Sequence, residues 1–151
     1  MKYYRVINLK NGKECCLRNG MENDGQAVLD NFNQTHGETD YLLSYPDENT
    51  FDVEKKRQYL KEKQDSQNEI EIVAIIDDTV VGTAGIQAIG SRYKVRHRAE
   101  YGISIAKEYW GLGILKLRKD TIRINFPLYC TKCKGESLID AKKFIVKEAR
   151  R

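Results

Sequence analysis

The chain has 151 residues, a length typical of a single domain that buries a hydrophobic core. Apolar residues make up 40% of the sequence and charged residues 32%, and no run approaches the roughly 20 apolar residues of a membrane-spanning helix. The formal charge of +4 suits an anionic ligand such as a phosphate, but it does not by itself indicate a nucleic-acid-binding protein.

The first residues, Met-Lys-Tyr-Tyr-Arg, contain no apolar signal segment, so we expect a cytoplasmic protein with no membrane partner. Residues 3–9 and 14–18 flank the dipeptide Asn11-Gly12, which is the strongest short sequence signal for a β-hairpin. The N-terminus is therefore predicted to form a hairpin. Cys15 and Cys16 are adjacent, and in a strand their side chains point to opposite faces, which makes them a poor metal-chelating pair.

Two helices are predicted next. The first has an apolar stripe with spacings of four, three and four residues, formed by Met21, Gly25, Val28 and Phe32. We expect it to end near Gln34, before a loop over residues 37–49. Thr50 or Asp52 can cap a second, charge-rich helix that runs to about Gln67.

Residues 69–76 are predicted to form a strand that is buried on both faces at its centre. Asp77-Asp78 makes a tight turn into a second strand over residues 79–89. That strand contains Gly82 and Gly85, and glycines inside a strand often mark a bulge or a close backbone approach. A polar, basic loop over residues 90–98 follows.

The next segment, residues 98–115, combines a strand pattern with a glycine turn. Its first half alternates, with one face formed by Ala99, Tyr101, Ile103 and Ile105, which predicts a strand with one face well buried. Gly111 and Gly113 follow, before apolar residues that we expect to start a helix. A glycine turn before a helix start is a typical anion site, because backbone N–H groups and the helix dipole both favour a phosphate.

Residues 103–114, Ile-Ser-Ile-Ala-Lys-Glu-Tyr-Trp-Gly-Leu-Gly-Ile, resemble the acetyl-CoA signature of the GNAT N-acetyltransferase superfamily. That signature reads Arg/Gln-x-x-Gly-x-Gly/Ala and follows the family's fourth strand. Here Trp110 stands where Arg or Gln is usual, Gly113 matches the first glycine, and Leu115 stands where the second Gly or Ala is expected. The predicted order of elements over residues 1–114 also matches the first half of a GNAT domain.

The resemblance implies an α/β fold with a mixed sheet, the GNAT-like acyl-CoA N-acyltransferase fold, with its C-terminal half missing or replaced. It also implies transfer of an acetyl group from acetyl-CoA to an amine, which could be a small amine, a polyamine or a protein N-terminus. The backbone of the fourth strand would pair with the pantetheine arm and the glycine loop would bind the pyrophosphate, through Ile103, Ser104, Ile105, Trp110, Gly111, Leu112, Gly113 and Ile114.

Glu100 is the candidate catalytic base, because several GNAT branches use a carboxylate on the fourth strand. Burial on a sheet face would bring the pKa of such a group toward the operating pH. The alternative is a solvated strand residue with no role in catalysis. The family's usual general acid, a tyrosine on its fourth helix, has no counterpart here. His36 lies where family members place substrate-contacting residues, and contact with substrate or none are equal alternatives.

Residues 115–151 do not continue the GNAT pattern. Residues 125–139, Asn-Phe-Pro-Leu-Tyr-Cys-Thr-Lys-Cys-Lys-Gly-Glu-Ser-Leu-Ile, resemble the second half of the small cysteine-rich KTR proteins. We interpret the chain as a natural fusion of a truncated acetyltransferase, residues 1–114, and a truncated cysteine-rich tail, residues 115–151.

The tail offers only half of a zinc site. Cys130 and Cys133 have metal-ligand spacing, but a structural zinc needs four ligands, so we expect no zinc unless another chain supplies a second pair. A short strand is predicted over residues 122–126, bounded by Pro127, and residues 138–146 are consistent with a strand or a two-turn helix.

A different class of function is also open. The truncated sheet can act as a catalytically inactive scaffold that binds CoA or mediates dimerisation. Half a GNAT domain leaves its fourth strand at an exposed sheet edge, and such an edge invites pairing with another chain. We therefore expect a homo-oligomer.

Overall fold

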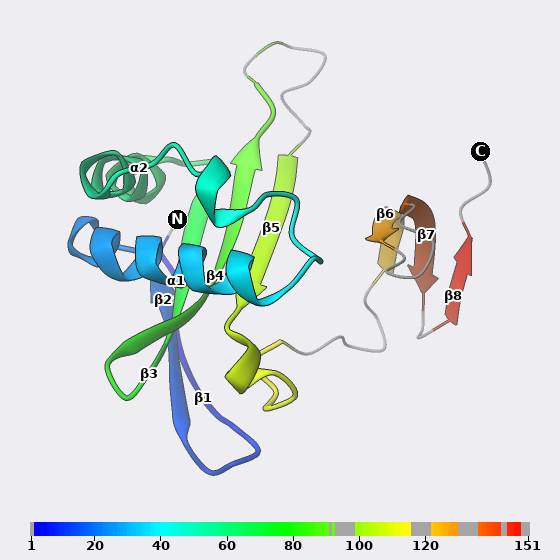
Figure 1. The fold of residues 1–151 in the computed structure, drawn as a ribbon, viewed down its shortest axis with the longest axis horizontal. Coiled ribbons are helices and arrows are strands. Elements are labelled where there is room, and N and C mark those ends of the chain that lie inside the picture. Colours follow the sequence, from blue (N-terminus) through cyan, green and yellow to red (C-terminus); the bar gives the residue numbers. More distant parts are fainter. Residues whose placement is uncertain are drawn as a thin grey trace. The chain divides into compact units, whose positions relative to one another are not determined.

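The structure, a computed structural model, describes residues 2–90, 92 and 99–115, and the backbone of residues 122–129, 136–142 and 145–148. The chain divides into two compact units, Met1–Ile114 and Leu115–Arg151. Figure 1 shows the elements of both units. Each unit is described by itself below.

The first unit is built on a five-stranded antiparallel sheet with the order β1-β2-β3-β4-β5, so that every strand pairs with its neighbour in sequence. β1 and β5 lie at the two edges. The bounds of the strands are β1 Tyr4–Asn8, β2 Glu14–Asn19, β3 Ile70–Ile76, β4 Thr79–Ala88 and β5 Ala99–Ile105.

Both predicted hairpin turns are confirmed. Between β1 and β2, Gly12 has a φ of +84°, and the Leu9 N–H donates to the Lys13 carbonyl at 2.8 Å. Between β3 and β4, Asp77 and Asp78 have φ values of +48° and +61°. Aspartate tolerates this left-handed region better than most residues, because its short polar side chain can hydrogen-bond locally.

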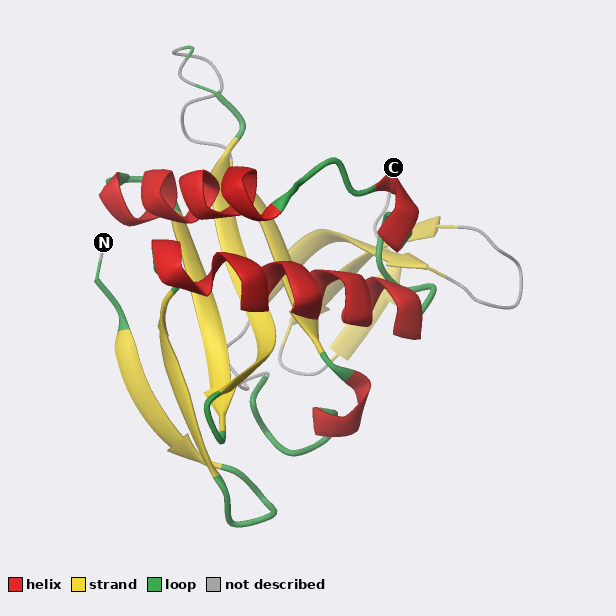
Figure 2. Ribbon diagram, turned by 60° about the vertical axis from the view of Figure 1, so that its left-hand side comes forward, coloured by secondary structure: helices red, strands yellow, loops and turns green. Residues whose placement is uncertain are grey.

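Two helices pack side by side on one face of the sheet, α1 Gly25–Glu38 and α2 Val53–Asp65 (Figure 2). We call this the helix face. A short 3₁₀ helix, η1 (Glu22–Asp24), leads into α1, and another, η2 (Pro46–Glu48), lies in the connection between the helices. The prediction of Asp52 as the cap of α2 is confirmed, because its side chain accepts a hydrogen bond from the Lys55 N–H at 2.8 Å.

The apolar stripe predicted for α1 is only partly correct. Val28 is buried, but Met21 precedes the helix and is 47% exposed, and the helix continues to Glu38 rather than ending near Gln34. Its other buried positions include Asn31 and Thr35. The Thr35 hydroxyl donates to the Asn31 carbonyl at 2.8 Å, so this polar side chain is buried without losing its hydrogen bond.

The core has two layers, one on each face of the sheet. On the helix face Val28, Leu60 and Val73 form a buried cluster. On the opposite face the buried cluster consists of Leu9, Cys15, Ala74, Ile76 and Val81. Since both clusters contain residues of β3, the prediction that this strand is buried on both faces is confirmed.

A β-bulge interrupts the pairing of β3 with β4. Ala74 pairs with Gly82 and Ile75 pairs with Val80, which leaves Val81 as the extra residue on β4. A side chain at Gly82 would meet the Ser104 carbonyl oxygen of β5 at 2.7 Å. The predicted bulge or close approach at this glycine is therefore confirmed.

The expectation that β5 has one well-buried face is wrong. Its residues 99–102 are exposed, with Tyr101 at 49%, and residues 103–105 are half-buried. The reason is its position at the edge: within the described part of the first unit, no strand pairs with its outer side. Alternation of apolar and polar residues predicts which side chains share a face of the strand, but it does not predict whether another element covers that face.

The second unit is a three-stranded antiparallel sheet with the order β6-β7-β8. Its strands are β6 Ile122–Tyr129, β7 Glu136–Lys142 and β8 Ile145–Glu148. The predicted strand is confirmed, but Pro127 does not end it, because Pro127 pairs with Leu138 inside the ladder. The described residues of the segment 138–146 lie in β7 and β8, so the helical alternative is wrong.

Across the described residues, no helix is both long enough and apolar enough to cross a membrane.

Candidate functional site

The segment after β5 forms a glycine loop, as predicted. A 3₁₀ helix, η3 (Lys107–Tyr109), follows the strand, and Gly111 and Gly113 then adopt φ values of +75° and +98°. L-residues with a side chain rarely take these values, so the conformation explains why both positions are glycine. We refer to residues 106–115 as the glycine loop.

Two hydrogen bonds fix the start of this loop against the sheet. The Ala106 N–H donates to the carbonyl of Val81, the bulge residue, at 2.9 Å. The indole Nε1–H of Trp110 donates to the Ile105 carbonyl at 2.6 Å. The bulge residue thus provides the carbonyl that accepts a hydrogen bond from the first residue of the loop.

The far end of the loop is held by the N-terminal hairpin and by the core. The Lys10 N–H donates to the Leu112 carbonyl at 3.0 Å. Tyr109, Leu112 and Ile114 pack against the buried cluster on the face opposite the helices. The loop is therefore anchored at several points on the sheet.

The residues predicted to bind the cosubstrate form one continuous path. Ile103, Ser104 and Ile105 pair with β4 through one edge, and their other edge has no strand partner in the described part of the unit. Along the path Trp110 and Gly111 are exposed, whereas three residues are half-buried: Leu112, Gly113 and Ile114. The exposed backbone N–H groups of a glycine loop can bind a phosphate, so these residues fit acetyl-CoA, the predicted cosubstrate. Their assignment to its binding site stays a prediction.

The helix that was expected after the loop is not described. Ile114 and Leu115 are not helical, residues 116–121 lie outside the described residues, and the next described element is β6.

Glu100 lies on the exposed part of β5, opposite Gln87 of β4. By alternation with Gly102 and Ser104, its side chain is on the helix face. The burial that was expected to tune its pKa is absent, because β5 is an edge strand and its first half is uncovered. Its role as a base stays a prediction.

A second carboxylate on the helix face was not singled out from the sequence. Glu71 of β3 accepts a hydrogen bond from the Tyr59 hydroxyl of α2 at 3.3 Å, and burial beneath α2 raises the pKa of Glu71. A side chain at Gly85, its partner on β4, would collide with the Glu71 carboxylate. The strand glycine at position 85 was the available signal, since it marks the close approach of another group.

The C-terminus of α1 also reaches the site. The carboxylate of Glu38 accepts a hydrogen bond from the Lys107 N–H at 2.7 Å, so it joins the helix layer to the beginning of η3. Glu38 lies four residues beyond Gln34, the predicted end of the helix, so this contact was not predicted.

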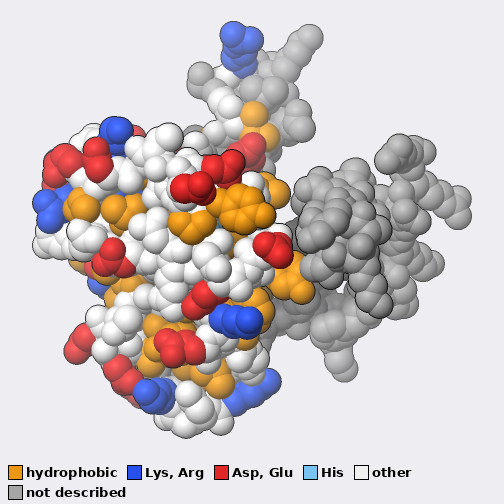
Figure 3. All heavy atoms as spheres, in the orientation of Figure 1, with side chains coloured by type: hydrophobic (Ala, Val, Ile, Leu, Met, Phe, Trp, Pro, Cys, Tyr) orange, Lys and Arg blue, Asp and Glu red, His pale blue; other side chains and the backbone are white. Residues whose placement is uncertain are grey.

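The connection between α1 and α2 brings aromatic side chains near the loop. The ring centroids of Tyr41 and Trp110 are 6.5 Å apart. Tyr41, Leu43 and Tyr45 are all largely exposed, and Figure 3 shows apolar groups at the surface among acidic ones. His36 is held by its own helix, since its ring stacks on Phe32 at 3.6 Å and its Nδ1 lies 2.8 Å from the Phe32 carbonyl oxygen.

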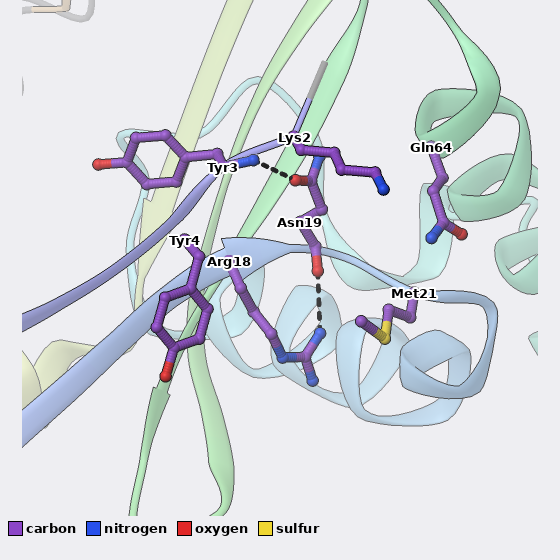
Figure 4. A pocket seen from close by; sticks show the side chains of 7 residues that line it. All are labelled: Lys2, Tyr3, Tyr4, Arg18, Asn19, Met21 and Gln64. Atoms are coloured by element: carbon purple, nitrogen blue, oxygen red, sulfur yellow. Dashed lines mark hydrogen bonds between the residues drawn. The ribbon is translucent and has the colours of Figure 1, made fainter.

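A separate cavity of about 440 Å³ lies at the ends of β1 and β2 (Figure 4), lined by Lys2, Tyr3, Tyr4, Arg18, Asn19, Met21 and Gln64. The arginine in its lining, Arg18, forms a bidentate ion pair with Asp24, with N–O distances of 2.6 and 2.9 Å. Because that charge is already balanced, the cavity is a weak candidate for an anion site.

Among the described residues, no group of three or more His, Cys, Asp and Glu side chains is arranged to hold a metal ion. Cys130 and Cys133 lie outside the described residues.

Comparisons with known proteins identify two family patterns in the sequence. The acetyltransferase (GNAT) family profile matches residues 36–117, which is more than half of the chain. The profile of the cysteine-rich KTR family matches residues 113–150. A search among curated proteins finds no match to this chain.

Solved structures similar to the chain are GNAT acetyltransferases. One is the acetyltransferase of the GNAT family from Streptococcus pneumoniae, with 26% identity, a TM-score of 0.63, and coverage of 66% of this chain and 59% of that chain. Another is the ribosomal-protein-alanine N-acetyltransferase from Brucella melitensis, with 26% identity, a TM-score of 0.53, and coverage of 65% and 58%.

A third, yncA of Salmonella typhimurium, was solved with its cofactor acetyl-CoA; it is 17% identical, with a TM-score of 0.54 and coverage of 66% and 56%. The predicted GNAT-like α/β fold is therefore confirmed. The chain spans less than two thirds of the length of these three proteins.

Proposed function

Because this chain belongs to the GNAT family of acetyltransferases, we propose that it transfers an acetyl group from acetyl-CoA to an amine. The observation that carries the proposal is the glycine loop, where Gly111 and Gly113 take positive φ values within the segment that resembles the family's acetyl-CoA signature, after β5 and η3. A similar structure that contains acetyl-CoA supports the choice of cosubstrate.

In the proposed mechanism, the free edge of β5 pairs with the amides of the pantetheine arm and the loop N–H groups hold the pyrophosphate. Acetyl-CoA supplies an activated thioester. Glu100 takes a proton from the acceptor ammonium, and the neutral amine attacks the thioester carbonyl. The new C–N bond forms as the C–S bond breaks, and the departing CoA thiolate takes up the second proton that the nitrogen releases as the amide forms.

We propose an acceptor that is a small amine, a polyamine or a protein N-terminus. The name of the Brucella melitensis neighbour supports the last of these, since that protein is a ribosomal-protein-alanine N-acetyltransferase. Two carboxylates of the sheet, Glu71 and Glu100, lie on the helix face and support a cationic acceptor in all three cases.

A second candidate function is a catalytically inactive scaffold that binds CoA or mediates dimerisation. Two observations favour it. The chain spans 59% of the Streptococcus pneumoniae enzyme, and Leu115 carries a side chain where the family signature has a second small residue. We propose that the division at Ile114 marks the fusion of the acetyltransferase part with the cysteine-rich tail.

Calorimetric titration with acetyl-CoA tests the proposed function. We expect saturable binding, and Gly113→Ala is expected to weaken it about tenfold, because an alanine in the left-handed region costs roughly 1–2 kcal/mol. Gly12→Ala is the matched control, since it introduces the same strain in the β1–β2 turn and is expected to leave affinity unchanged. The absence of binding at millimolar acetyl-CoA would reject both the enzyme and the CoA-binding scaffold.

We also propose that a second copy of the chain covers the free edge of β5. Light scattering at micromolar concentration is then expected to give the mass of a homo-oligomer. Tyr101→Lys places a charge on this edge and is expected to shift the protein toward monomer, because lysines discourage edge-to-edge pairing. A strictly monomeric wild-type protein would overturn this proposal.

A further inference from the structure

The ammonium group of Lys56 lies among three aromatic rings. Its Nζ is 4.4 Å from the ring centroid of Phe51, 5.1 Å from that of Tyr59 and 5.6 Å from that of Phe32. All three distances fall within the roughly 6 Å over which a ring face attracts a cation. Phe51 and Tyr59 also pack edge to face at 5.9 Å. We call these three rings the aromatic cage.

The rings come from separate segments that the fold brings together. Phe32 is on α1, Tyr59 is on α2, and Phe51 lies just before the cap of α2. The cage holds the ammonium group without a carboxylate: no ion pair joins Lys56 to an acidic residue in the part of the chain that the structure describes.

The neighbouring lysine shows a different arrangement. Lys55 points outward with 64% of its side chain exposed and pairs with Asp52 at 3.8 Å. Lys56 is partly withdrawn from water, and burial lowers its pKa while the charge of Glu71 opposes that change. The other charged or titratable groups facing Glu71 and Tyr59 are Lys63 and Glu69, which pair with each other at 2.8 Å.

A groove of about 410 Å³ adjoins the cage, and two of its walls are the cage rings Phe51 and Tyr59. The rest of its lining is polar and carries two carboxylates, in the set Glu54, Lys55, Gln58 and Glu62. The carboxylates give the groove a chemistry that attracts a cation. The two shared rings connect the groove to the place where Lys56 holds its ammonium group.

We propose that the aromatic cage, with Glu71 behind Tyr59, is a binding site for a primary alkylammonium ligand, and that Lys56 occupies it in this structure. A ligand enters along the groove, places its ammonium group among the rings and displaces the flexible Lys56 side chain into solvent. Glu54 and Glu62 add to the attraction at the entrance. The site does not depend on acetyl transfer, so it stands or falls separately from the proposed function.

Truncating the resident lysine tests the site directly. Lys56→Ala removes the three outer methylenes and the amine, which together match n-propylammonium. We expect this variant to bind n-propylammonium at least tenfold more tightly than the wild type does, because the Lys56 ammonium no longer competes. The ammonium of Lys63, 5.0 Å from the Tyr59 ring centroid, stays paired with Glu69. Lys55→Ala removes the same atoms from the exposed neighbour and is expected to bind as weakly as the wild type. Ring-proton chemical shifts of labelled Phe and Tyr report binding without acetyl-CoA.

Two further comparisons separate charge recognition from simple cavity filling. n-Propanol has the same shape without the charge and is expected to bind the Lys56→Ala variant at least tenfold less tightly than n-propylammonium. Adding Glu71→Gln to that variant is expected to reduce n-propylammonium affinity severalfold. Equal affinity for the alcohol and the ammonium, or equal affinity of Lys56→Ala and Lys55→Ala for the ammonium, would overturn the proposal.

Lys56→Met provides a variant that keeps the cage filled. Methionine retains an apolar stem of similar length, so it preserves packing between α1 and α2, and we expect no gain in n-propylammonium affinity. If Lys56→Ala fails to fold, Lys56→Ser replaces it, with the same expected gain over Lys56→Met. Tight binding of n-propylammonium by Lys56→Met would place the ligand elsewhere and overturn the assignment.

Discussion

Replacing Glu100 with glutamine is expected to slow acetyl transfer by about 10²- to 10⁴-fold, the range that a positioned general base contributes. Glutamine keeps the size of the side chain and cannot take a proton, so acetyl-CoA affinity is expected to stay unchanged. The rate is measured as thiol release at saturating acetyl-CoA with a panel of primary amines, and the affinity by calorimetry.

Two other carboxylates are suitable comparisons for Glu100→Gln. Glu14 is exposed on β2, and Glu14→Gln is expected to leave the rate unchanged. Glu71 lies on the helix face with a pKa raised by burial, which makes it the strongest competitor for the role of base. If Glu71→Gln slows transfer by hundreds of times while Glu100→Gln does not, the base is Glu71 and the assignment of Glu100 is wrong.

Replacing Leu60 with alanine is expected to lower the free energy of unfolding by about 2–5 kcal/mol. Leu60 of α2 is fully buried (0% exposed) and packs with Val28 and Val73, so the shorter side chain leaves a cavity between the helix and the sheet. Urea unfolding followed by circular dichroism measures the change as a shift of the midpoint at constant slope.

Leu43→Ala is the matched control for Leu60→Ala, because it deletes the same atoms from a side chain that is 94% exposed. A surface substitution of this kind is expected to change the free energy of unfolding by less than about 0.5 kcal/mol. Equal losses in the two variants would show that the helix face is not a packed core.

The turns and caps were predictable because their causes are local. Asn11-Gly12 and Asp77-Asp78 need positive φ values that these residue types tolerate, and Asp52 caps α2 through an N–H only three residues away. The glycine loop belongs to the same class. Gly111 and Gly113 adopt positive φ values that glycine tolerates, and the sequence marks both positions.

Burial depends on distant residues, and there the sequence was less informative. Thr35 can be buried because its hydroxyl donates a hydrogen bond to its own helix, which offsets the free-energy cost of removing a polar group from water. Hydrophobic periodicity takes no account of such a bond and therefore does not predict this buried position. Glu71, set between Ile70 and Ile72, has the alternation of a solvated strand residue, but α2 covers it and Gly85 leaves room for it. β5 shows the opposite case, since its pattern predicts a buried face, whereas Ala99 and Tyr101 are exposed and Ile103 and Ile105 are only half-buried.

The position of the last anchors of the glycine loop bears on how such a chain could arise by recombination. The Leu112 carbonyl holds the loop to the hairpin, and Ile114 packs on the core as the final residue of the first unit. The described hydrogen bonds and packing contacts that anchor the loop are therefore all made by residues before position 115. A crossover there, which the proposed fusion requires, would exchange the downstream sequence and leave these anchors of the loop unchanged.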